Sequence, residues 1–367
     1  MKKIRSMSEL PVEILTKIFL MSPPNSLVSC KAACKSFRNI IKNSNFARAH
    51  LTRFLSHYSP CIMLNLMYKP LHPYRESHHL LLSIDDAKNE IITSPFITNP
   101  SIPNVGEYDM VYVVGSCNGL ICFSVWYDRG KEYDLLFILW NLVSGETRFL
   151  PKPKYSPTGR GIVTEFGFIP ETNDYVVVKL DGLIHVRGEV YKMSTDSWTD
   201  IDCNVVKDYV QVERDGVPVF LNGCFHWRAL GYGSNYMVNY KLVSEEVGVI
   251  KGHDVVELDD WELTTVEESL AMLFYDPNIV PHKFELWVMD DYQVDDSWVL
   301  RYRIVDDGCK FLCPVGCLGN GLMITYERDY YGVYLLDMKT GQKTKISAVP
   351  YGWSVTGFSK FSGSLVP

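Results

Sequence analysis

Residues 11–50 contain no glycine, although the chain of 367 residues has 25. Glycine weakens helices and supplies the left-handed conformations of tight turns. Its absence excludes a turn-rich β structure from this segment and favours helices. From about residue 76 onward the sequence changes to short β-rich segments that are divided by Gly, Asn, Asp and Pro.

Common enzyme motifs are also missing. The chain has no Gly-x-x-x-x-Gly-Lys-Ser/Thr, no His-Glu-x-x-His and no Gly-x-Ser-x-Gly. These absences exclude a P-loop nucleotidase, a zinc protease of that class and a serine hydrolase with that elbow. They do not exclude an enzyme whose catalytic residues converge from distant segments of the chain.

A secretory signal is not recognisable, because the first apolar segment, ILTKIFLM, is short and contains a lysine. The longest uncharged run, Met110–Tyr127, comes close to the length of a membrane span. Asn118 and Gly119 interrupt its middle, so it predicts two strands around a tight turn instead. The ten cysteines are scattered, which is typical of reduced thiols. We expect a protein of the cytoplasm or nucleus with no membrane partner.

Charge divides the chain into two parts. Residues 1–53 carry a net charge of +8 and the remaining residues −15, which gives −7 for the whole chain. The basic part has no aromatic platform or recognition motif for nucleic acid, and an acidic protein partner accounts for its charge equally well. The asymmetry predicts two parts with different partners.

The glycine-free segment predicts a small bundle of short helices. Ile14, Leu15, Ile18 and Phe19 form an apolar stripe at helical spacing. Further helices are expected after Pro23-Pro24, after a break at Lys35-Ser36 and after a cap at Asn45. A bundle of about forty residues buries little apolar area by itself. We therefore expect it to need a partner.

Cys30 and Cys34 lie four residues apart on one expected helix face. They could supply two metal ligands, but no nearby His or Cys completes a set of four. Packing between helices or at an interface explains both.

The segments LPVEILTKIF, SLVSCKAACKSFRNII and FARAHL together resemble an F-box over about forty-five residues. The resemblance implies docking onto a Skp-type adaptor, and through it onto the cullin and RING subunits of a ubiquitin ligase. The residues implied to bind the adaptor are Leu10, Pro11, Ile14, Ile18, Leu27, Cys30, Cys34, Lys35, Phe37 and Ile41. Two positions depart from the family pattern, because Phe37 replaces a usual Trp and Ser22 a usual Leu.

The rest of the chain contains a repeat. Strand–turn–strand segments recur around anchors that are 51, 49, 47 and 47 residues apart. The anchors are Trp140, Tyr191, Tyr240, Trp287 and Tyr334. A fainter copy covers residues 81–94. This period predicts an all-β propeller of about six blades behind the helical head. The segment 356–366 is expected to pair with an early strand and close the ring.

Several of these segments, among them GSCNGL, LWNLVSGETRFLP, FGFIPETNDYVVV, VYKMSTDSW and FLNGCFHW, resemble the F-box-associated domain of plants. The resemblance implies an F-box over residues 6–52, a linker over 53–75 and the propeller domain over 76–367. Members of the family act as substrate receptors. The best hypothesis is therefore a non-catalytic receptor subunit that binds an unknown target protein. A ligase-independent scaffold and a propeller enzyme remain alternatives.

Other candidate residues have structural explanations. Cys309, Cys313 and Cys317 lack a fourth zinc ligand, so we expect buried thiols and neither a metal nor a cofactor. The acid pairs beginning at Asp259, Asp290, Asp295 and Asp306 fall in expected turns. We expect His226, beside Trp227, to be a buried structural histidine.

Aromatic residues near expected loops are the candidates for binding the target, because exposed Trp and Tyr make good interface anchors. They are Trp126, Tyr127, Tyr232, Tyr236, Tyr330, Tyr331 and Trp353.

Overall fold

The computed structural model describes most of the chain. The described residues are 10–22, 24–43, 45–47, 49–50, 53, 61–68, 76–85, 90–93, 97–98, 110–128, 133–141, 146–157, 162–181, 186–206, 210–213, 216–231, 233–255, 258, 260–276, 282–306, 312–319, 321–327, 332–349 and 353–361. Within them, no helix is long and apolar enough to cross a membrane.

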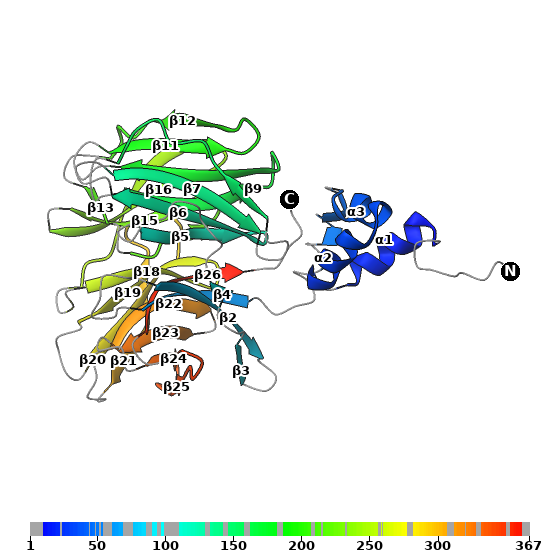
Figure 1. The fold of residues 1–367 in the computed structure, drawn as a ribbon. Helices are drawn as coiled ribbons and strands as arrows, with labels where there is room; N and C mark the ends of the chain where they lie inside the picture. The colour runs from blue at the N-terminus through cyan, green and yellow to red at the C-terminus, as the bar shows by residue number, and fades with distance from the viewer. Residues whose placement is uncertain are drawn as a thin grey trace.

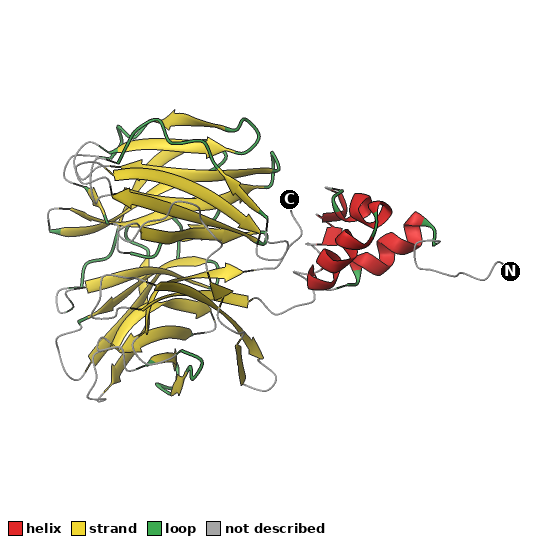
Figure 2. Cartoon of the chain, in the orientation of Figure 1, coloured by secondary structure: helices red, strands yellow, loops and turns green. Residues whose placement is uncertain are grey.

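The N-terminal part is a helical head. It contains α1 (Val12–Leu20), α2 (Pro24–Ala33) and α3 (Lys35–Ile41), followed by a short helical stretch at 45–47. α2 begins at a proline, which is compatible with a first helical position. The break before α3 falls at Cys34, whose backbone is extended. The predicted helices are confirmed, and Figure 2 shows them on one side of the strands. Two details were wrong. Lys35 and Ser36 belong to α3, so the break lies at Cys34, and Oδ1 of Asn43 caps the last stretch by accepting from the backbone N–H groups of Asn45 and Phe46.

The remaining described residues form six antiparallel sheets, which we number I to VI. Sheet I contains β1 (Cys61–Tyr68), β2 (Glu76–Asp85), β3 (Glu90–Thr93), β4 (Ile97–Thr98) and β26 (Trp353–Phe361). Sheet II contains β5 (Met110–Cys117), β6 (Leu120–Asp128), β7 (Tyr133–Asn141) and β8 (Thr147–Phe149). Sheet III contains β9 (Ile162–Ile169), β10 (Asp174–Asp181), β11 (Arg187–Lys192) and β12 (Ser197–Ile201). Sheet IV contains β13 (Gln211–Val212), β14 (Val219–Leu221), β15 (Cys224–Gly231), β16 (Ser234–Lys241) and β17 (Glu246–Lys251). Sheet V contains β18 (Asp260–Val266), β19 (Ser269–Tyr275), β20 (His282–Met289) and β21 (Trp298–Asp306). Sheet VI contains β22 (Leu312–Gly319), β23 (Leu322–Glu327), β24 (Val333–Asp337) and β25 (Lys343–Lys345).

The sheets are arranged as a propeller. Innermost strands of neighbouring sheets contact each other, namely β5 with β9, β14 with β18, β18 with β22, and β26 with both β22 and β5. Buried apolar clusters fill the boundaries between consecutive sheets from II to VI and between VI and I. Every anchor of the sequence repeat lies on the third strand of its sheet. A helical head followed by an all-β propeller is therefore confirmed.

The C-terminal strand closes sheet I. β26 pairs with β1 in antiparallel register, with Cys61 opposite Phe361 and Tyr68 opposite Trp353. The predicted closure by the C-terminal segment is confirmed. The same pairing corrects the predicted linker over 53–75, because residues 61–68 form a strand of the propeller. β26 lies at the other end of the chain and β2 begins eight residues after β1 ends, so no tight-turn signal marks β1 in the sequence.

The uncharged run at 110–127 is confirmed as two strands, β5 and β6. Asn118 and Gly119 join them with positive φ angles of 49° and 80°. Asn222 and Gly223 repeat this turn between β14 and β15. Such φ values fit the type I′ turn that suits the twist of a hairpin.

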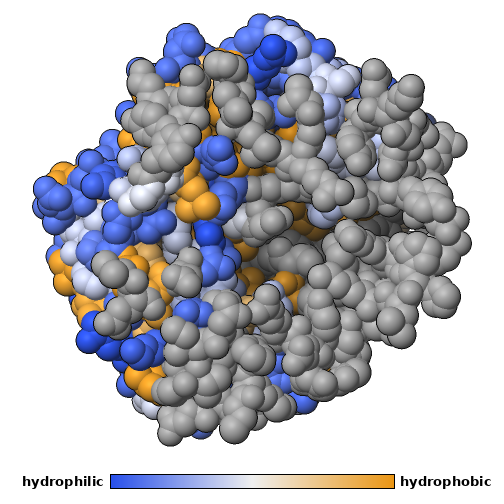
Figure 3. All heavy atoms as spheres, turned by 90° about the vertical axis from the view of Figure 1, so that its left-hand side faces the viewer, coloured by the Kyte–Doolittle hydropathy of each residue, from blue (hydrophilic) through white to orange (hydrophobic). Residues whose placement is uncertain are grey.

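Strand direction defines two faces of the propeller. Connections from the first to the second strand, and from the third to the fourth, lie at one end of every sheet. β1 takes the second position of sheet I, so it begins at this end, and the arrowhead of β26 points toward the helices (Figure 1). We call this end the head-side face and the opposite end the far face. Figure 3 shows the side away from the head, where described hydrophilic and hydrophobic residues are interspersed.

Candidate functional site

The helical head has its own small core. The buried side chains that form it are Leu15, Phe19, Leu27, Phe37, Ile41 and Phe46. Phe19 and Phe37 meet edge to face with 5.0 Å between ring centroids. Phe37, which stands where the family usually has Trp, is 7% exposed and fills this core. The substitution therefore keeps an aromatic contact between α1 and α3.

Ser22, the second departure from the family pattern, terminates α1. Its hydroxyl donates to the carbonyl of Ile18 at 2.9 Å. Its own carbonyl lies 2.8 Å from Nε2 of His50. The hydroxyl bond stays within the end of α1 and has no counterpart in a leucine side chain, whereas the contact with His50 uses the backbone carbonyl, which any residue at this position offers.

The outer side of α1 carries exposed apolar side chains. Ile14, Ile18 and Met21 are 43%, 37% and 72% exposed and follow each other at i, i+4 and i+7. Val12, at the start of the helix, is 55% exposed. A helical stripe that faces water on a small bundle is a typical docking surface. We call Ile14, Ile18 and Met21 the α1 stripe.

The predicted adaptor-binding residues fall into three groups. Pro11, Ile14, Ile18 and Lys35 are exposed. Leu10, Cys30 and Cys34 are half-buried and pack against the head core. Leu27, Phe37 and Ile41 are buried in that core, so in this structure they contact other helices. Adaptor binding by these residues stays a prediction. Sequence reasoning missed Val12 and Met21, although Met21 continues the spacing of Ile14 and Ile18.

An ion pair between described residues joins the head to the propeller. Lys31 of α2 donates to Glu146 at 2.9 Å, and Glu146 lies in the connection between β7 and β8. This connection belongs to the head-side face, which agrees with the direction of β1. Exposed ion pairs of this kind contribute little stability, on the order of 0–1 kcal/mol.

Of the seven predicted target-binding aromatics, the structure describes the side chains of three, and none of the three is exposed. Trp126 and Tyr127 are 5% and 8% exposed, because β6 continues through them to Asp128. Their prediction as exposed loop anchors is therefore wrong. Tyr236 is half-buried at the beginning of β16 and packs on the cluster between sheets III and IV. Trp353 begins β26, and its side chain lies outside the described residues, as do Tyr232, Tyr330 and Tyr331.

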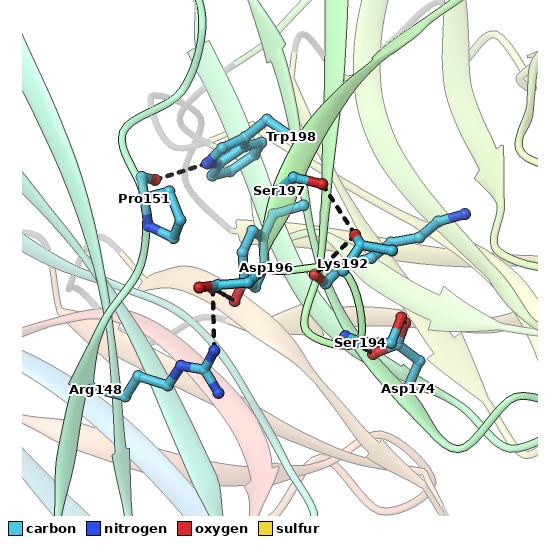
Figure 4. A network of polar contacts seen from close by, with 10 residues as sticks. Arg148, Pro151, Asp174, Lys192, Ser194, Asp196, Ser197 and Trp198 are labelled. Carbon is cyan, nitrogen blue, oxygen red and sulfur yellow. Dashed lines mark hydrogen bonds and ion pairs between the residues drawn. The ribbon is translucent and has the colours of Figure 1, made fainter.

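A polar network links sheets II and III at the head-side face (Figure 4). Arg148 of β8 pairs with Asp196 at 3.0 Å, and the Tyr191 hydroxyl donates to the same carboxylate at 2.7 Å. The hydrogen bond from Tyr191, together with Arg148, lowers the pKa of Asp196. Trp198 Nε1 donates to the carbonyl of Pro151 at 2.7 Å. Each donor has an acceptor, so the network has a structural role.

Sheet III also contains a buried ion pair. Lys179 and Glu189 are each 1% exposed and lie 2.8 Å apart. Lys179 also donates to the carbonyl of Tyr155, and Glu189 accepts from the backbone N–H of Lys154 at 2.7 Å. The pair thereby fastens the connection 151–157 to the sheet. Buried charges that are satisfied in this way position a segment and add little net stability.

Arg228 on β15 joins sheet IV to sheet V. Its guanidinium pairs with Glu213 and with Asp260, the latter at 2.7 Å, and lies 5.0 Å from the ring centroid of Trp261. Glu262 is nearby, and burial raises its pKa to about 8. The cluster therefore contains one carboxyl that is protonated at neutral pH beside the two acidic side chains that pair with Arg228.

The described members of the cysteine and histidine candidates, Cys313, Cys317 and His226, are buried. Cys313 and Cys317 lie in β22, and burial raises the pKa of Cys317 to about 12. Within the described residues, no three His, Cys, Asp or Glu side chains are grouped to hold a metal ion. Cys309 lies outside them. His226 is fully buried with Nε2 2.9 Å from the Tyr292 hydroxyl, which confirms its structural role.

The predicted acid pairs differ in environment. Asp290, Asp291, Asp295 and Asp296 are exposed in the connection between β20 and β21, as predicted for turn residues. Asp260 begins β18 and pairs with Arg228, so it is not a solvated turn residue. Asp306 ends β21, and Asp259 and Asp307 lie outside the described residues.

Comparison with known proteins agrees with this architecture. A family described as "F-box associated beta propeller domain" matches residues 67–324, and one described as "F-box-like" matches residues 7–52. An F-box/kelch-repeat protein of Arabidopsis thaliana is 24% identical, covering 89% of this chain and 87% of the relative. An F-box protein of the same plant is 25% identical, covering 81% and 73%.

Solved structures give weaker likenesses. TolB from Acinetobacter baumannii is 12% identical with a TM-score of 0.40, covering 81% of this chain and 71% of that one. Dipeptidyl peptidase 4 of Porphyromonas gingivalis is 11% identical with a TM-score of 0.36, covering 78% and 44%. At these TM-scores the likeness carries no argument about this chain.

The fold and the head thus define an F-box protein with a propeller as its second part. The chain belongs to the F-box associated beta propeller family, whose match covers more than half of its residues.

Proposed function

We propose that the protein is the substrate-recognition subunit of an SCF-type ubiquitin ligase, in the cytoplasm or nucleus. The F-box head binds a Skp-type adaptor and, through it, the cullin and RING subunits, while the propeller, with each sheet as one blade, binds a target protein. The observation that carries this proposal is the α1 stripe, because its side chains face water on a head that matches an F-box.

The energetics support docking of the head onto another protein. Fully burying one Ile or Met side chain contributes roughly 1.5–3 kcal/mol. The stripe therefore offers enough apolar surface for a stable contact once a partner covers it. The net charge of +8 over residues 1–53 suits an acidic partner and speeds its association.

The proposed mechanism is proximity and needs no catalytic group on this chain. A target held on the propeller has a raised effective concentration near the conjugating enzyme that the ligase recruits. The buried thiols agree with this role. Burial raises the pKa of Cys122 and Cys317, so these cysteines stay protonated and are poor nucleophiles.

Co-expression with a Skp-type adaptor followed by gel filtration tests the proposal. We expect wild type to form a one-to-one complex and Ile14→Asp/Ile18→Asp to lose it, with binding weakened at least about 100-fold because two buried contacts become buried charges. Val299→Asp/Val305→Asp is the matched control, since both valines are similarly exposed on β21. Wild type that stays free of the adaptor while folded would favour the ligase-independent scaffold.

A further inference from the structure

A polar groove lies between sheets IV and V toward the head-side face. It has a volume of about 410 Å³, and its lining includes Asn239, Lys241, Glu246, Gly248, Gln293 and Asp295. Asn239 and Lys241 belong to β16, Glu246 and Gly248 to β17, and the last two residues to the connection after β20. We call this the Asn239 groove. Its size is within the range of small binding pockets.

Asn239 has a buried carboxamide without a partner. The residue is 1% exposed, and neither its Oδ1 nor its Nδ2 makes a hydrogen bond to any described residue. A buried amide in this condition costs free energy, roughly 1–3 kcal/mol. Folded proteins rarely retain such groups without a reason, and a bound ligand is one of the reasons.

The internal repeat shows that this asparagine is unusual. Each anchor residue follows a third-strand residue that faces the next sheet. In sheets II, III, V and VI that position is Leu139, Val190, Leu286 and Val333, and all four are buried in the apolar clusters between sheets. In sheet IV the same position is Asn239. A polar group thus replaces an apolar one at a single blade boundary among these five.

Gly248 is a second departure from the repeat. It lies opposite Asn239 in the register, where the corresponding pairs are Leu139 with Arg148, Val190 with Thr199 and Leu286 with Tyr302. A Cβ at position 248 would lie 2.5 Å from Oδ1 of Asn239. Only glycine therefore leaves room for the carboxamide beside the outer strand.

The opposite wall is an unusually long connection. Residues 290–297 join β20 to β21, whereas the same connection spans four or five residues in every other sheet. It is ordered internally, since Asp290 N donates to the carbonyl of Ser297 at 3.0 Å and Ser297 Oγ donates to that of Val294 at 2.8 Å. Tyr292 reaches across to His226, which is the neighbour of Asn239 in the register of β15 and β16.

The chemistry of the groove indicates its ligand. A carboxamide presents an N–H donor and a C=O acceptor side by side, which matches the C=O and N–H of a peptide backbone. At the rim, Glu246 and Asp295 outweigh Lys241, which lies 3.8 Å from Glu246. Negative charge at the rim favours a basic side chain. His226, which lies opposite Asn239 on β15, is neutral and adds no positive charge, because burial lowers its pKa to about 4.

We propose that the Asn239 groove binds an extended peptide segment whose backbone amide pairs with the Asn239 carboxamide and whose Lys or Arg side chain lies near Glu246 and Asp295. The proposal adds to the proposed function a place where the propeller holds part of its target. Its chemistry does not depend on adaptor binding, so either proposal can fail alone.

A structural role for Asn239 is the competing explanation, since a buried water could satisfy its carboxamide. The two explanations predict opposite effects on stability. If the carboxamide has no hydrogen-bond partner in the free protein, Asn239→Val, which copies Val190 of sheet III, removes an unpaired polar group and raises the midpoint of thermal unfolding. If a buried water satisfies it, the replacement breaks those hydrogen bonds and lowers the midpoint.

The experiment uses the full chain without adaptor and an array of capped decapeptides of random sequence with a fixed central Lys, Arg, Ala or Glu. We expect the Lys and Arg sets to bind wild type at least tenfold better than the Glu set. Asn239→Val, and Asn239→Val/Gly248→Thr, which restores the Val190–Thr199 pair of sheet III, should lose this binding and keep or raise the thermal midpoint. Asn204→Val, at an exposed turn, is the control and should bind as wild type.

Besides a lowered thermal midpoint in the Asn239 variants, two binding results would overturn the proposal. One is peptide binding that persists in both Asn239 variants, which would place the peptide elsewhere. The other is an array that binds wild type without preference for a basic residue, or not at all. Adaptor binding by the same preparations is measured separately, so a loss of the peptide site cannot be mistaken for failure of the head.

Discussion

Single buried residues set how the propeller responds to pH, and Glu165 on β9 is the clearest case. It is 9% exposed, and its Oε1 accepts the backbone N–H of Phe166 at 3.0 Å. Gly115 of β5 lies against it, since a Cβ there would be 2.5 Å from Oε1. Burial raises the pKa of Glu165 to about 8. This boundary between sheets II and III therefore contains a carboxyl that is protonated at neutral pH.

Glu165→Gln should flatten the pH dependence of stability. The folded protein holds this proton up to about pH 8, whereas an unperturbed glutamate releases it near pH 4.5. The stabilising contribution of the bound proton is therefore complete below about 4.5 and is lost as the pH rises toward 8. Urea unfolding at pH 5, 6, 7 and 8 should show the free energy of unfolding falling by up to about 1.4 kcal/mol per pH unit more in wild type than in Glu165→Gln.

Glu171→Gln provides the control for this titration. Glu171 is exposed in the turn between β9 and β10, so neutralising it should leave the slope of wild type unchanged. Equal slopes for Glu165→Gln and wild type would mean that Glu165 is ionised in the folded protein at neutral pH.

Elements with a local signal could be predicted from the sequence, and elements without one could not. The Asn-Gly turns at 118–119 and 222–223 fix their hairpins within a few residues, and the glycine-free head shows its helical spacing directly. β1 has partners on other segments, including a C-terminal strand, so its residues were indistinguishable from a linker. Trp126 and Tyr127 were misplaced because strand ends depend on the neighbouring strand β7, which continues opposite them.

The turn at 222–223 provides a prediction at the scale of elements. Gly223 has a φ of 72° and a Cβ there would meet nothing within 4 Å, so Gly223→Ala should cost only the left-handed backbone conformation, about 1 kcal/mol. Gly188→Ala should cost more, because its Cβ would lie 2.8 Å from both Cys203 Sγ and Ile201 Cβ. Chemical unfolding of the two variants measures both costs. A larger loss for Gly223→Ala would contradict the open surroundings of Gly223 or the crowding at Gly188.

At the scale of the molecule, the repeat made the propeller predictable from the sequence. It did not predict the binding surfaces of the propeller. Anchors recur on the third strands because each sheet packs against its neighbours in the same way. Asn239 carries no signal as a single residue in a strand. It can be identified as unusual only by comparison with the equivalent positions of the other sheets. Gly248 and the connection 290–297, which the fold places beside it, also have to be known. Likewise, the exposed side of α1 differs from its buried side only once Leu15 and Phe19 have packed.

Closure of the propeller between its two ends gives the last prediction. β26 and β1 place Phe361 opposite Cys61, and directly opposite residues in antiparallel strands have Cα atoms at a distance that suits a disulfide. Phe361→Cys should therefore lose two free thiols on mild oxidation and gain about 2–4 kcal/mol of stability, because the bridge closes a loop of nearly the whole propeller. Ser359→Cys lies on the same strand opposite Met63, so it should keep its free thiol and its stability. Positions 359 and 361 lie two residues apart on β26. If the two variants oxidise to the same extent, the register between β1 and β26 differs from the one described.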